Sequence, residues 1–186
     1  MSSLWLIRHG ETEWSAAGRH TSATDLALTA EGERKAAEVG RMLAGKTFAL
    51  VLSSPLRRAL DTCRLAGYSA EVTPDLREWG YGAYEGLTTA EIQVTNPGWT
   101  IWTGTPPSGE SAEEVGARAD RVIARTVAAG GDVALFGHGH MLRVLAARWL
   151  GLEPAGGRMF ALSTGSVSVL GYEREARVVQ GWNRTG

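Results

Sequence analysis

Cysteine is nearly absent from this chain of 186 residues: Cys63 is the single one, so no disulfide bond forms within the chain, which agrees with a reducing compartment. No apolar run approaches the roughly 20 residues that a membrane-spanning helix needs. The start Met1-Ser2-Ser3 has neither a charged region nor a signal-like apolar segment. These absences predict a protein with no membrane partner and a cytoplasmic location.

An excess of positive charge is also lacking. The 19 Lys and Arg residues and the 20 Asp and Glu residues give a formal net charge of -1, and no basic run or stripe occurs. Proteins that bind nucleic acids usually carry such a basic surface, so we expect no nucleic-acid partner.

The hydrophobic content of 44% and the charged content of 21% are typical of soluble globular proteins. A chain of this length is sufficient for one well-packed domain and short for two, so we predict a single domain over residues 1–186. A lid-like insertion is predicted at about 79–111, where a stretch rich in Gly and aromatic residues is followed by a long irregular loop.

Short apolar runs alternate with amphipathic stretches along the chain. Runs of strand length lie near 4–7, 48–52, 71–73 and 132–136, and the segments 166–172 and 176–182 are typical of a hairpin. Helices are indicated at 29–45, from Ser53 or Ser54 onwards with Pro55 in the first turn, from near Thr88, and at 111–129 and 141–150. This alternation predicts an α/β fold with a mostly parallel sheet, helices on both of its faces and an antiparallel element at one edge.

Three of the predicted strands end in polar motifs. These motifs are Arg8-His9-Gly10, the run SSPLRR at 53–58, and Gly137-His138-Gly139. Ligands in open α/β sheets bind at the carboxyl ends of the strands, so these side chains converge if the strands are neighbours. Taken alone, an Arg-His pair at a strand end is equally compatible with a buried histidine bonded to the backbone.

Together these side chains match phosphoryl transfer through a histidine. Arg8 and Arg58 would hold the phosphoryl oxygens while His9 attacks phosphorus, and His138 would donate a further hydrogen bond. Glu78 is the candidate proton donor to the leaving alcohol, which predicts an acidic to mildly acidic pH optimum. Nearby guanidinium charge disfavours protonated His9 and so preserves its lone pair. No metal and no other cofactor is expected, because the arginines stabilise the negative charge.

Five motifs in order, RHGETEW, SSPLRRALDT, LREWGYGAYEGL, SGES and GHGHMLR, resemble the histidine phosphatase superfamily, the phosphoglycerate mutase-like group. The resemblance covers the chain from Leu4 through at least Arg143. It implies a three-layer α/β/α sandwich, with His9 as the phosphorylated nucleophile and Glu78 as acid and base. It also implies a phosphate pocket made of Arg8, Arg58 and His138, for which Ser15 and Gly139 are further candidates.

Two departures from the mutase pattern favour hydrolysis. Ser15 stands where mutases have Asn, and the segment from Glu78 to Ala117 contains no Lys, Arg or His. A lid without cations holds a second phosphate poorly, so water rather than a second substrate reaches the phosphoenzyme. Trp14-Ser15, REWGYGAYEG, WTIW and GHGHMLR look most similar to the branch of mycobacterial acid phosphatases and the fungal sedoheptulose-1,7-bisphosphatase.

Four residues are weaker candidates for substrate binding: His20, Thr21, Tyr81 and Arg143. Each has an alternative, since an Arg on an amphipathic helix is more often solvated and aromatic residues are often core. The clustering of aromatic residues in the Gly-rich loop indicates that Tyr81 and at least one Trp line the substrate mouth.

Other conspicuous residues have plainer interpretations. Arg57 is predicted to be structural, because the family motif places the functional Arg immediately before Ala59. Cys63 is predicted to be a small core residue, and Ser53 and Ser54 to be helix caps. His140 invites a metal reading, but the chain lacks the further ligands that such a site needs.

The sequence thus predicts a metal-independent phosphatase acting on small phosphomonoesters, sugar phosphates among them, through a phosphohistidine. A phosphoglycerate mutase remains an alternative that would need a bisphosphoglycerate primer and a basic lid. A catalytically idle module that binds phosphorylated ligands is an alternative of another class. The expected partner is a small phosphorylated molecule, and the terminal hairpin and the 7 Trp residues leave room for a homodimer.

Overall fold

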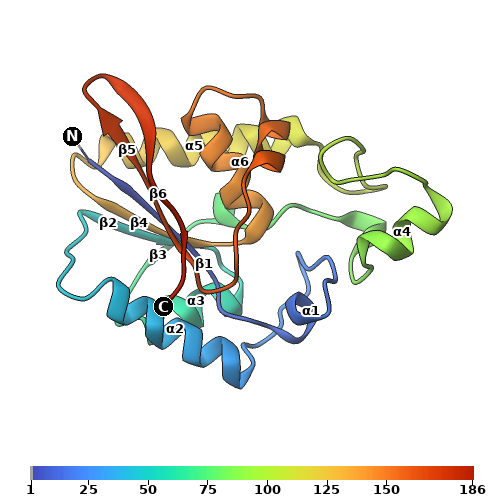
Figure 1. The fold of residues 1–186 in the computed structure, drawn as a ribbon, viewed down its shortest axis with the longest axis horizontal. Helices are drawn as coiled ribbons and strands as arrows, with labels where there is room; N and C mark the ends of the chain where they lie inside the picture. The colour runs from blue at the N-terminus through green and yellow to red at the C-terminus, as the bar shows by residue number, and fades with distance from the viewer. Residues whose placement is uncertain (1) are drawn as a thin grey trace.

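The computed structural model describes residues 2–186 and is built on one six-stranded sheet in the order β3-β2-β4-β1-β5-β6 (Figure 1). The strands are β1 Leu4–Arg8, β2 Leu50–Ser53, β3 Glu71–Val72, β4 Val133–Gly137, β5 Val167–Glu173 and β6 Ala176–Arg184. The first four are mutually parallel, whereas β5 runs antiparallel to β1 and β6 antiparallel to β5. The predicted parallel sheet with an antiparallel edge is confirmed.

Helices cover both faces of this sheet. They are α1 Glu13–Ala16, α2 Ala30–Met42, α3 Arg57–Leu65, α4 Thr89–Thr95, α5 Ala112–Ala128 and α6 Gly139–Trp149, with 3-10 turns at Pro74–Leu76, Gly82–Tyr84 and Pro154–Met159. Figure 1 shows α5 and α6 on one side of the sheet and α2 and α3 on the other. The predicted three-layer α/β/α sandwich is therefore confirmed.

Alternation along the strands supplies a core to each face. In β1, Leu4 and Leu6 pack into the cluster that includes α5 and α6, whereas Ile7 packs into the cluster with Val39 of α2 and Cys63 of α3. Successive side chains of a strand point to opposite faces, so a short, fully apolar run suits a strand that is covered on both sides.

Strand order brings the polar motifs together. β4 lies between β1 and β2, with Arg8 in register with Gly137 and Ser53 with Phe136. All three strands run in the same direction, so the residues that follow them meet at one edge of the sheet. The convergence predicted from the sequence is confirmed.

Several helix starts follow the predicted caps. Thr29, Thr88 and Ser111 each accept a backbone hydrogen bond at the first turn of the helix that follows. The start of α3 was predicted wrongly: it begins at Arg57 after Leu56, which makes no side-chain cap, and Pro55 lies before the helix. Neither Ser53 nor Ser54 caps this helix, because their hydroxyls are engaged at the strand ends.

The loop after β1 lies directly on α2. A Cβ at Gly10 would come within 2.2 Å of the Gly32 carbonyl oxygen, and one at Gly32 within 2.1 Å of the Glu11 oxygen. Both positions therefore require glycine, and the contact fixes the backbone that follows His9.

Residues 79–111 form a short helix, α4, and long loops that lie beyond one end of the sheet in Figure 1. Part of this segment is core, since Trp79, Trp99 and Ile101 are almost fully buried. Among residues 2–186, every helix is too short or too polar to cross a membrane.

Candidate active site

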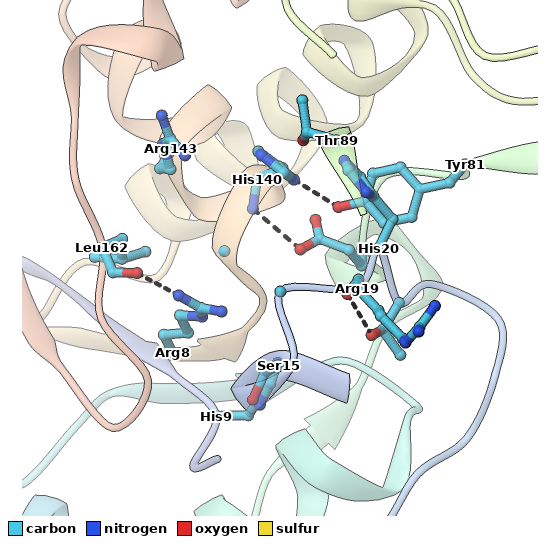
Figure 2. A pocket seen from close by; sticks show the side chains of 14 residues that line it. Arg8, His9, Ser15, Arg19, His20, Tyr81, Thr89, His140, Arg143 and Leu162 are labelled. Carbon is cyan, nitrogen blue, oxygen red and sulfur yellow. Dashed lines mark hydrogen bonds between the residues drawn. The ribbon is translucent and has the colours of Figure 1, made fainter. Parts of the chain in front are cut away.

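A pocket of about 210 Å³ opens at the carboxyl edge of the sheet (Figure 2). Its lining comes from the end of β1 and the loop after it, from the segment that leads into α4, from the first half of α6, and from the segment before β5. The lining residues are Arg8, His9, Ser15, Gly18, Arg19, His20, Thr21, Glu78, Tyr81, Thr89, Gly139, His140, Arg143 and Leu162.

His9 presents one defined nitrogen to this pocket. Its Nδ1 lies 2.6 Å from the carbonyl oxygen of Gly10, and a carbonyl only accepts, so the proton sits on Nδ1. Burial, followed by the charges of Arg8 and Arg58, holds the pKa of His9 well below its usual value. The imidazole is therefore neutral near neutral pH, with its lone pair on Nε2. Guanidinium charge lowers the pKa of His9, as expected from the sequence, but burial lowers this pKa more.

Arg58 lies beneath the pocket and is fully buried. Its terminal nitrogens donate to the carbonyls of Thr24 at 3.0 Å, Thr21 at 3.2 Å and Ser22 at 3.1 Å. Its Nε has no hydrogen-bond partner. Burial lowers the pKa of Arg58, and the negative charge of Glu78 opposes that shift.

Arg8 is held in a similar way. One terminal nitrogen donates to the carbonyl of Leu162, while its buried Nε has no partner. The guanidinium packs against the start of α6, because a Cβ at Gly139 would lie only 3.3 Å from its central carbon. Glycine at 139 therefore leaves Arg8 in place beside the backbone of α6.

His138 completes the buried end of the site. Its ring lies 5.1 Å from the His9 ring, edge to face, and its Nδ1 has no hydrogen-bond partner. Burial and then the charge of Arg58 hold its pKa well below the usual histidine value. Three buried nitrogens, on Arg8, Arg58 and His138, thus lack an acceptor. Buried donors of this kind are almost always satisfied, so their arrangement fits a bound anion.

Glu78 lies across the pocket at the N-terminus of α6. Its carboxylate accepts from the backbone nitrogens of Trp79 at 2.8 Å, Met141 at 2.8 Å and His140 at 3.0 Å. The helix starts at Gly139 rather than at the predicted Met141 because a residue far away in the sequence caps it.

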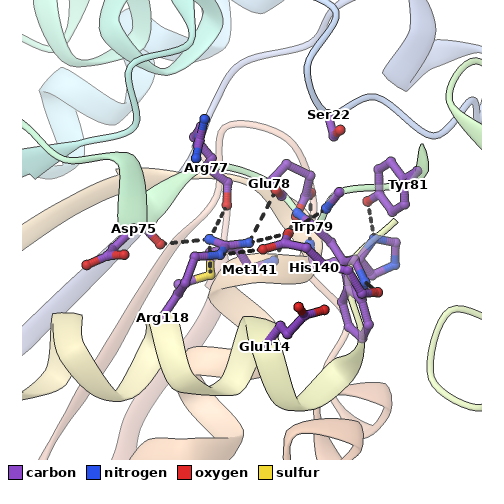
Figure 3. A network of polar contacts seen from close by, with 12 residues as sticks. Ser22, Asp75, Arg77, Glu78, Trp79, Tyr81, Glu114, Arg118, His140 and Met141 are labelled. Atoms are coloured by element: carbon purple, nitrogen blue, oxygen red, sulfur yellow. Dashed lines mark hydrogen bonds and ion pairs between the residues drawn. The ribbon is translucent and has the colours of Figure 1, made fainter. Parts of the chain in front are cut away.

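A second network holds the backbone that carries Glu78 (Figure 3). Arg118 of α5 forms a bidentate pair with Glu110, at 2.9 and 2.8 Å. It also donates to the carbonyls of Asp75 and Arg77 at 2.8 and 2.9 Å. Glu110 in turn accepts from the Gly80 nitrogen at 2.7 Å. The segment on both sides of Glu78 is therefore anchored to α5.

The comparisons with known proteins follow the same lines as the geometry. The family model for the histidine phosphatase superfamily, branch 1, matches residues 4–185. The chain belongs to this superfamily. It is 42% identical over 188 residues to an acid phosphatase of Mycobacterium tuberculosis, covering 98% of this chain and 93% of the relative.

Two further similarities agree with this membership. The sedoheptulose 1,7-bisphosphatase of Saccharomyces cerevisiae is 34% identical, over 79% of this chain and 67% of the relative. The solved structure of an open reading frame product from Mycobacterium tuberculosis superposes with a TM-score of 0.95 at 41% identity, covering 99% of this chain and 98% of the other. The branch expected from the motifs is confirmed, and the predicted phosphatase class is supported.

In this histidine phosphatase, the residues predicted for the phosphate pocket lie together, but three of them are placed or bonded differently from the prediction. Arg58 and His138 lie behind the lining rather than in it. Ser15 reaches the lining, but its hydroxyl donates to the Thr12 carbonyl at 3.0 Å and accepts from the Thr12 nitrogen at 2.9 Å. Ser15 and Thr12 thereby form a capping box at the N-terminus of α1, a short helix that the sequence analysis did not predict.

The weaker candidates His20, Thr21, Tyr81 and Arg143 all reach the outer wall of the pocket. The Arg143 guanidinium stacks on Trp102 at 4.6 Å from the ring centre, and its Nε donates to the Gly157 carbonyl at 3.1 Å. The expectation that a Trp lines the mouth was wrong for the described chain, because no tryptophan is among the lining residues. Trp102 instead lies under Arg143.

Sequence reasoning missed five lining residues: Gly18, Arg19, Thr89, His140 and Leu162. The hydroxyl oxygen of Tyr81 lies 2.5 Å from Nδ1 of His140, and the ring of His20 stacks on the His140 ring. The repeated histidine in Gly-His-Gly-His was the visible signal. His138 precedes α6 in an extended conformation and His140 lies in the first turn of α6, so both lie at the same edge of the sheet.

Two predictions concern residues outside the site. Arg57 is exposed and pairs with Asp61 at 3.2 Å, as a structural residue would. Cys63 is in the core, and burial raises the pKa of its thiol to about 12. Within residues 2–186, His, Cys, Asp and Glu side chains form no group of three that would hold a metal ion.

Proposed function

We propose that this histidine phosphatase is a metal-independent phosphatase that hydrolyses small phosphomonoesters through a phosphohistidine on His9. The observation that carries the proposal is the geometry around His9. A neutral imidazole with its lone pair on Nε2 faces the pocket beside three buried donors that lack acceptors, on Arg8, Arg58 and His138. A nucleophile surrounded by unfilled donors is suited to a phosphoryl group.

In the first step, Nε2 of His9 attacks phosphorus and the bond from phosphorus to the ester oxygen breaks. The leaving oxygen takes a proton from the protonated carboxyl of Glu78, so an alcohol departs instead of an alkoxide. Arg8, Arg58 and His138 hold the remaining phosphoryl oxygens, with the backbone nitrogen of Gly139 at the positive end of α6 as a further donor. The two guanidinium groups supply the charge stabilisation.

In the second step, water attacks phosphorus and its proton passes to the Glu78 carboxylate. The bond between phosphorus and Nε2 breaks, which releases inorganic phosphate and restores neutral His9 and protonated Glu78. Three backbone nitrogens hold the Glu78 carboxylate in this position, so the same group serves both steps without moving far.

The outer wall suits the remainder of a small polar substrate. Arg143 is partly desolvated, donates to the backbone carbonyls of Gly157 and Arg158 rather than to a carboxylate, and is held by the ring of Trp102. An oriented guanidinium that no carboxylate pairs with directly favours a polar or anionic group of the substrate, such as that of a sugar phosphate. His20, Thr21 and Tyr81 would contact the same part, and Ser15 the phosphoryl end.

Hydrolysis is favoured over phosphoglycerate mutation by the distribution of cations in the wall. Residues 78–117 contribute none, and Arg19, which comes from another segment, already pairs with Glu91 at 3.3 Å, so Arg143 alone supplies an unpaired cation to the outer wall among the lining residues. A bisphosphorylated primer would need a more basic lid to stay bound between half-reactions. A module that only binds phosphorylated ligands would not require the neutral nucleophile and the acid facing it.

Release of phosphate from p-nitrophenyl phosphate, with EDTA present from about pH 5 to about pH 7, tests the proposal. We expect turnover by the wild type and none by His9→Ala. The phosphoenzyme should be labile in acid and stable in alkali, as is typical of phosphohistidine. Interconversion of phosphoglycerates that requires added bisphosphoglycerate, without phosphate release, would establish a mutase instead. Binding of inorganic phosphate with neither activity would establish the binding module.

A further inference from the structure

The hydroxyl of Ser54 contacts the buried histidine of the site. Its Oγ lies 2.7 Å from Nε2 of His138, and both residues are 0% exposed. Ser54 follows β2 and His138 follows β4, so this bond joins two neighbouring strand ends. The Ser54 backbone nitrogen also donates to the Phe136 carbonyl at 3.0 Å, which fixes the position of the hydroxyl relative to the histidine.

The direction of this bond follows from the other contacts of Ser54. Its Oγ accepts from the Leu56 nitrogen at 3.3 Å, and its one hydrogen still needs an acceptor. Among the described residues, Nε2 of His138 is the one acceptor in reach of the hydroxyl hydrogen. Ser54 therefore donates to Nε2, and the single proton of the neutral imidazole is left on Nδ1.

Nδ1 is the nitrogen that has no partner in the protein, although it is buried beside His9. With the proton on Nδ1, His138 offers a donor to an anion. The other tautomer would present a lone pair to the phosphoryl oxygens and repel them. The tautomer of His9 is fixed in the same way, because the Gly10 carbonyl accepts the Nδ1 proton and leaves Nε2 free for attack.

We propose that Ser54 is a positioning residue that sets the tautomer of His138, so that the Nδ1 proton is donated to the transferred phosphoryl group. The proposal rests on the proposed function for the identity of the anion. The bond between Ser54 and Nε2 is a property of the free protein and is measurable without turnover.

The test compares Ser54→Ala with Ser53→Ala. Ser53 is a matched control, because it is equally buried on the same strand end and its hydroxyl donates to the Ser54 carbonyl at 2.9 Å rather than to a histidine. Nitrogen-15 NMR of the histidine rings reports which nitrogen carries the proton. Wild type and Ser53→Ala are expected to show protonated Nδ1 on His138, whereas Ser54→Ala should show a share of the proton on Nε2.

Affinity and turnover provide the second readout. We expect Ser54→Ala to weaken binding of inorganic phosphate about 10-fold and to lower kcat/KM for p-nitrophenyl phosphate about 10- to 100-fold, as is typical when the partner of a binding group is lost. Ser53→Ala should remain near wild type in both. Thermal unfolding identifies any variant that is merely unfolded, and such a sample is replaced by Ser54→Cys, whose thiol is a weaker donor.

Protonated Nε2 in the wild type, or unchanged phosphate affinity in a folded Ser54→Ala with a changed tautomer, would overturn the proposal. If no variant and not even the wild type hydrolyses p-nitrophenyl phosphate, the proposed function fails on its own. The NMR spectra and the phosphate affinities still decide the role of Ser54 in that case.

Discussion

Arg58 and Arg118 are both buried arginines, and the charges around them differ. Arg118 forms a bidentate pair with Glu110, whereas Arg58 has three carbonyls, an Nε without a partner, and no ion pair within residues 2–186. A buried charge without a counter-ion is costly unless a ligand supplies one. The comparison separates an arginine that is paired within the fold from one that is free to pair with an anion.

The largest expected effect comes from Arg58→Met, which keeps an apolar stem and removes the charge. We expect kcat/KM for p-nitrophenyl phosphate to fall about 1000-fold, because a preorganised donor to the developing charge is lost. Inorganic phosphate binding, measured by calorimetry, should be lost as well. If Arg58→Met keeps the wild-type affinity for phosphate, Arg58 does not bind the anion.

Arg118→Met should affect stability more than Arg58→Met does. It leaves Glu110 without its partner, and we expect the free energy of unfolding in urea to fall by about 2 to 4 kcal/mol. Phosphate affinity should be retained. The double variant Arg118→Met with Glu110→Gln should recover part of the lost stability. If Arg58→Met and Arg118→Met destabilise the protein equally, the distinction between a paired and an unpaired arginine is contradicted.

Arginine charge also acts on three histidines of the site, of which His9 and His138 are buried and His140 is partly buried. Burial is the first cause that holds the pKa values of His9, His138 and His140 well below the usual value, and neighbouring arginine charge adds to it. In the unfolded chain each histidine titrates near about pH 6.5, so below that pH the unfolded state binds more protons than the folded state.

The histidine contribution to stability is therefore fully present above about pH 6.5 and is lost as the pH falls below it, by about 1.4 kcal/mol per pH unit for each histidine. Urea unfolding at a series of pH values measures the slope. His140→Gln should make it shallower by about one proton, while a slope that is unchanged by this variant would show that His140 is not buried in its neutral form in solution.

The smallest expected effect concerns the outer wall. Arg143→Met should lower the ratio of kcat/KM for a sugar bisphosphate to that for p-nitrophenyl phosphate by about 10-fold, as the loss of one charged contact predicts. Arg177 is the matched control, because it stacks on Trp149 at 4.4 Å in the same manner but lies on β6, outside the pocket. If Arg177→Met changes the ratio equally, Arg143 has no part in substrate selection.

The sequence by itself determined most of the elements and the chemistry of the strand ends. Apolar runs of strand length, capped amphipathic helices and the motifs around His9, Arg58 and His138 are local patterns, and local patterns follow from side-chain periodicity and hydrogen bonding to nearby backbone. Glu78 was a candidate through the motif that contains it.

Only the tertiary structure decided how these groups are protonated and held. Strand order places β4 between β1 and β2, and so brings Ser54 to His138 across 84 positions of the chain. It also brings Glu78 to the start of α6 and leaves Arg58 without a carboxylate. Burial and the identity of a distant partner set a group's charge and tautomer, and neither is encoded in the residues next to it.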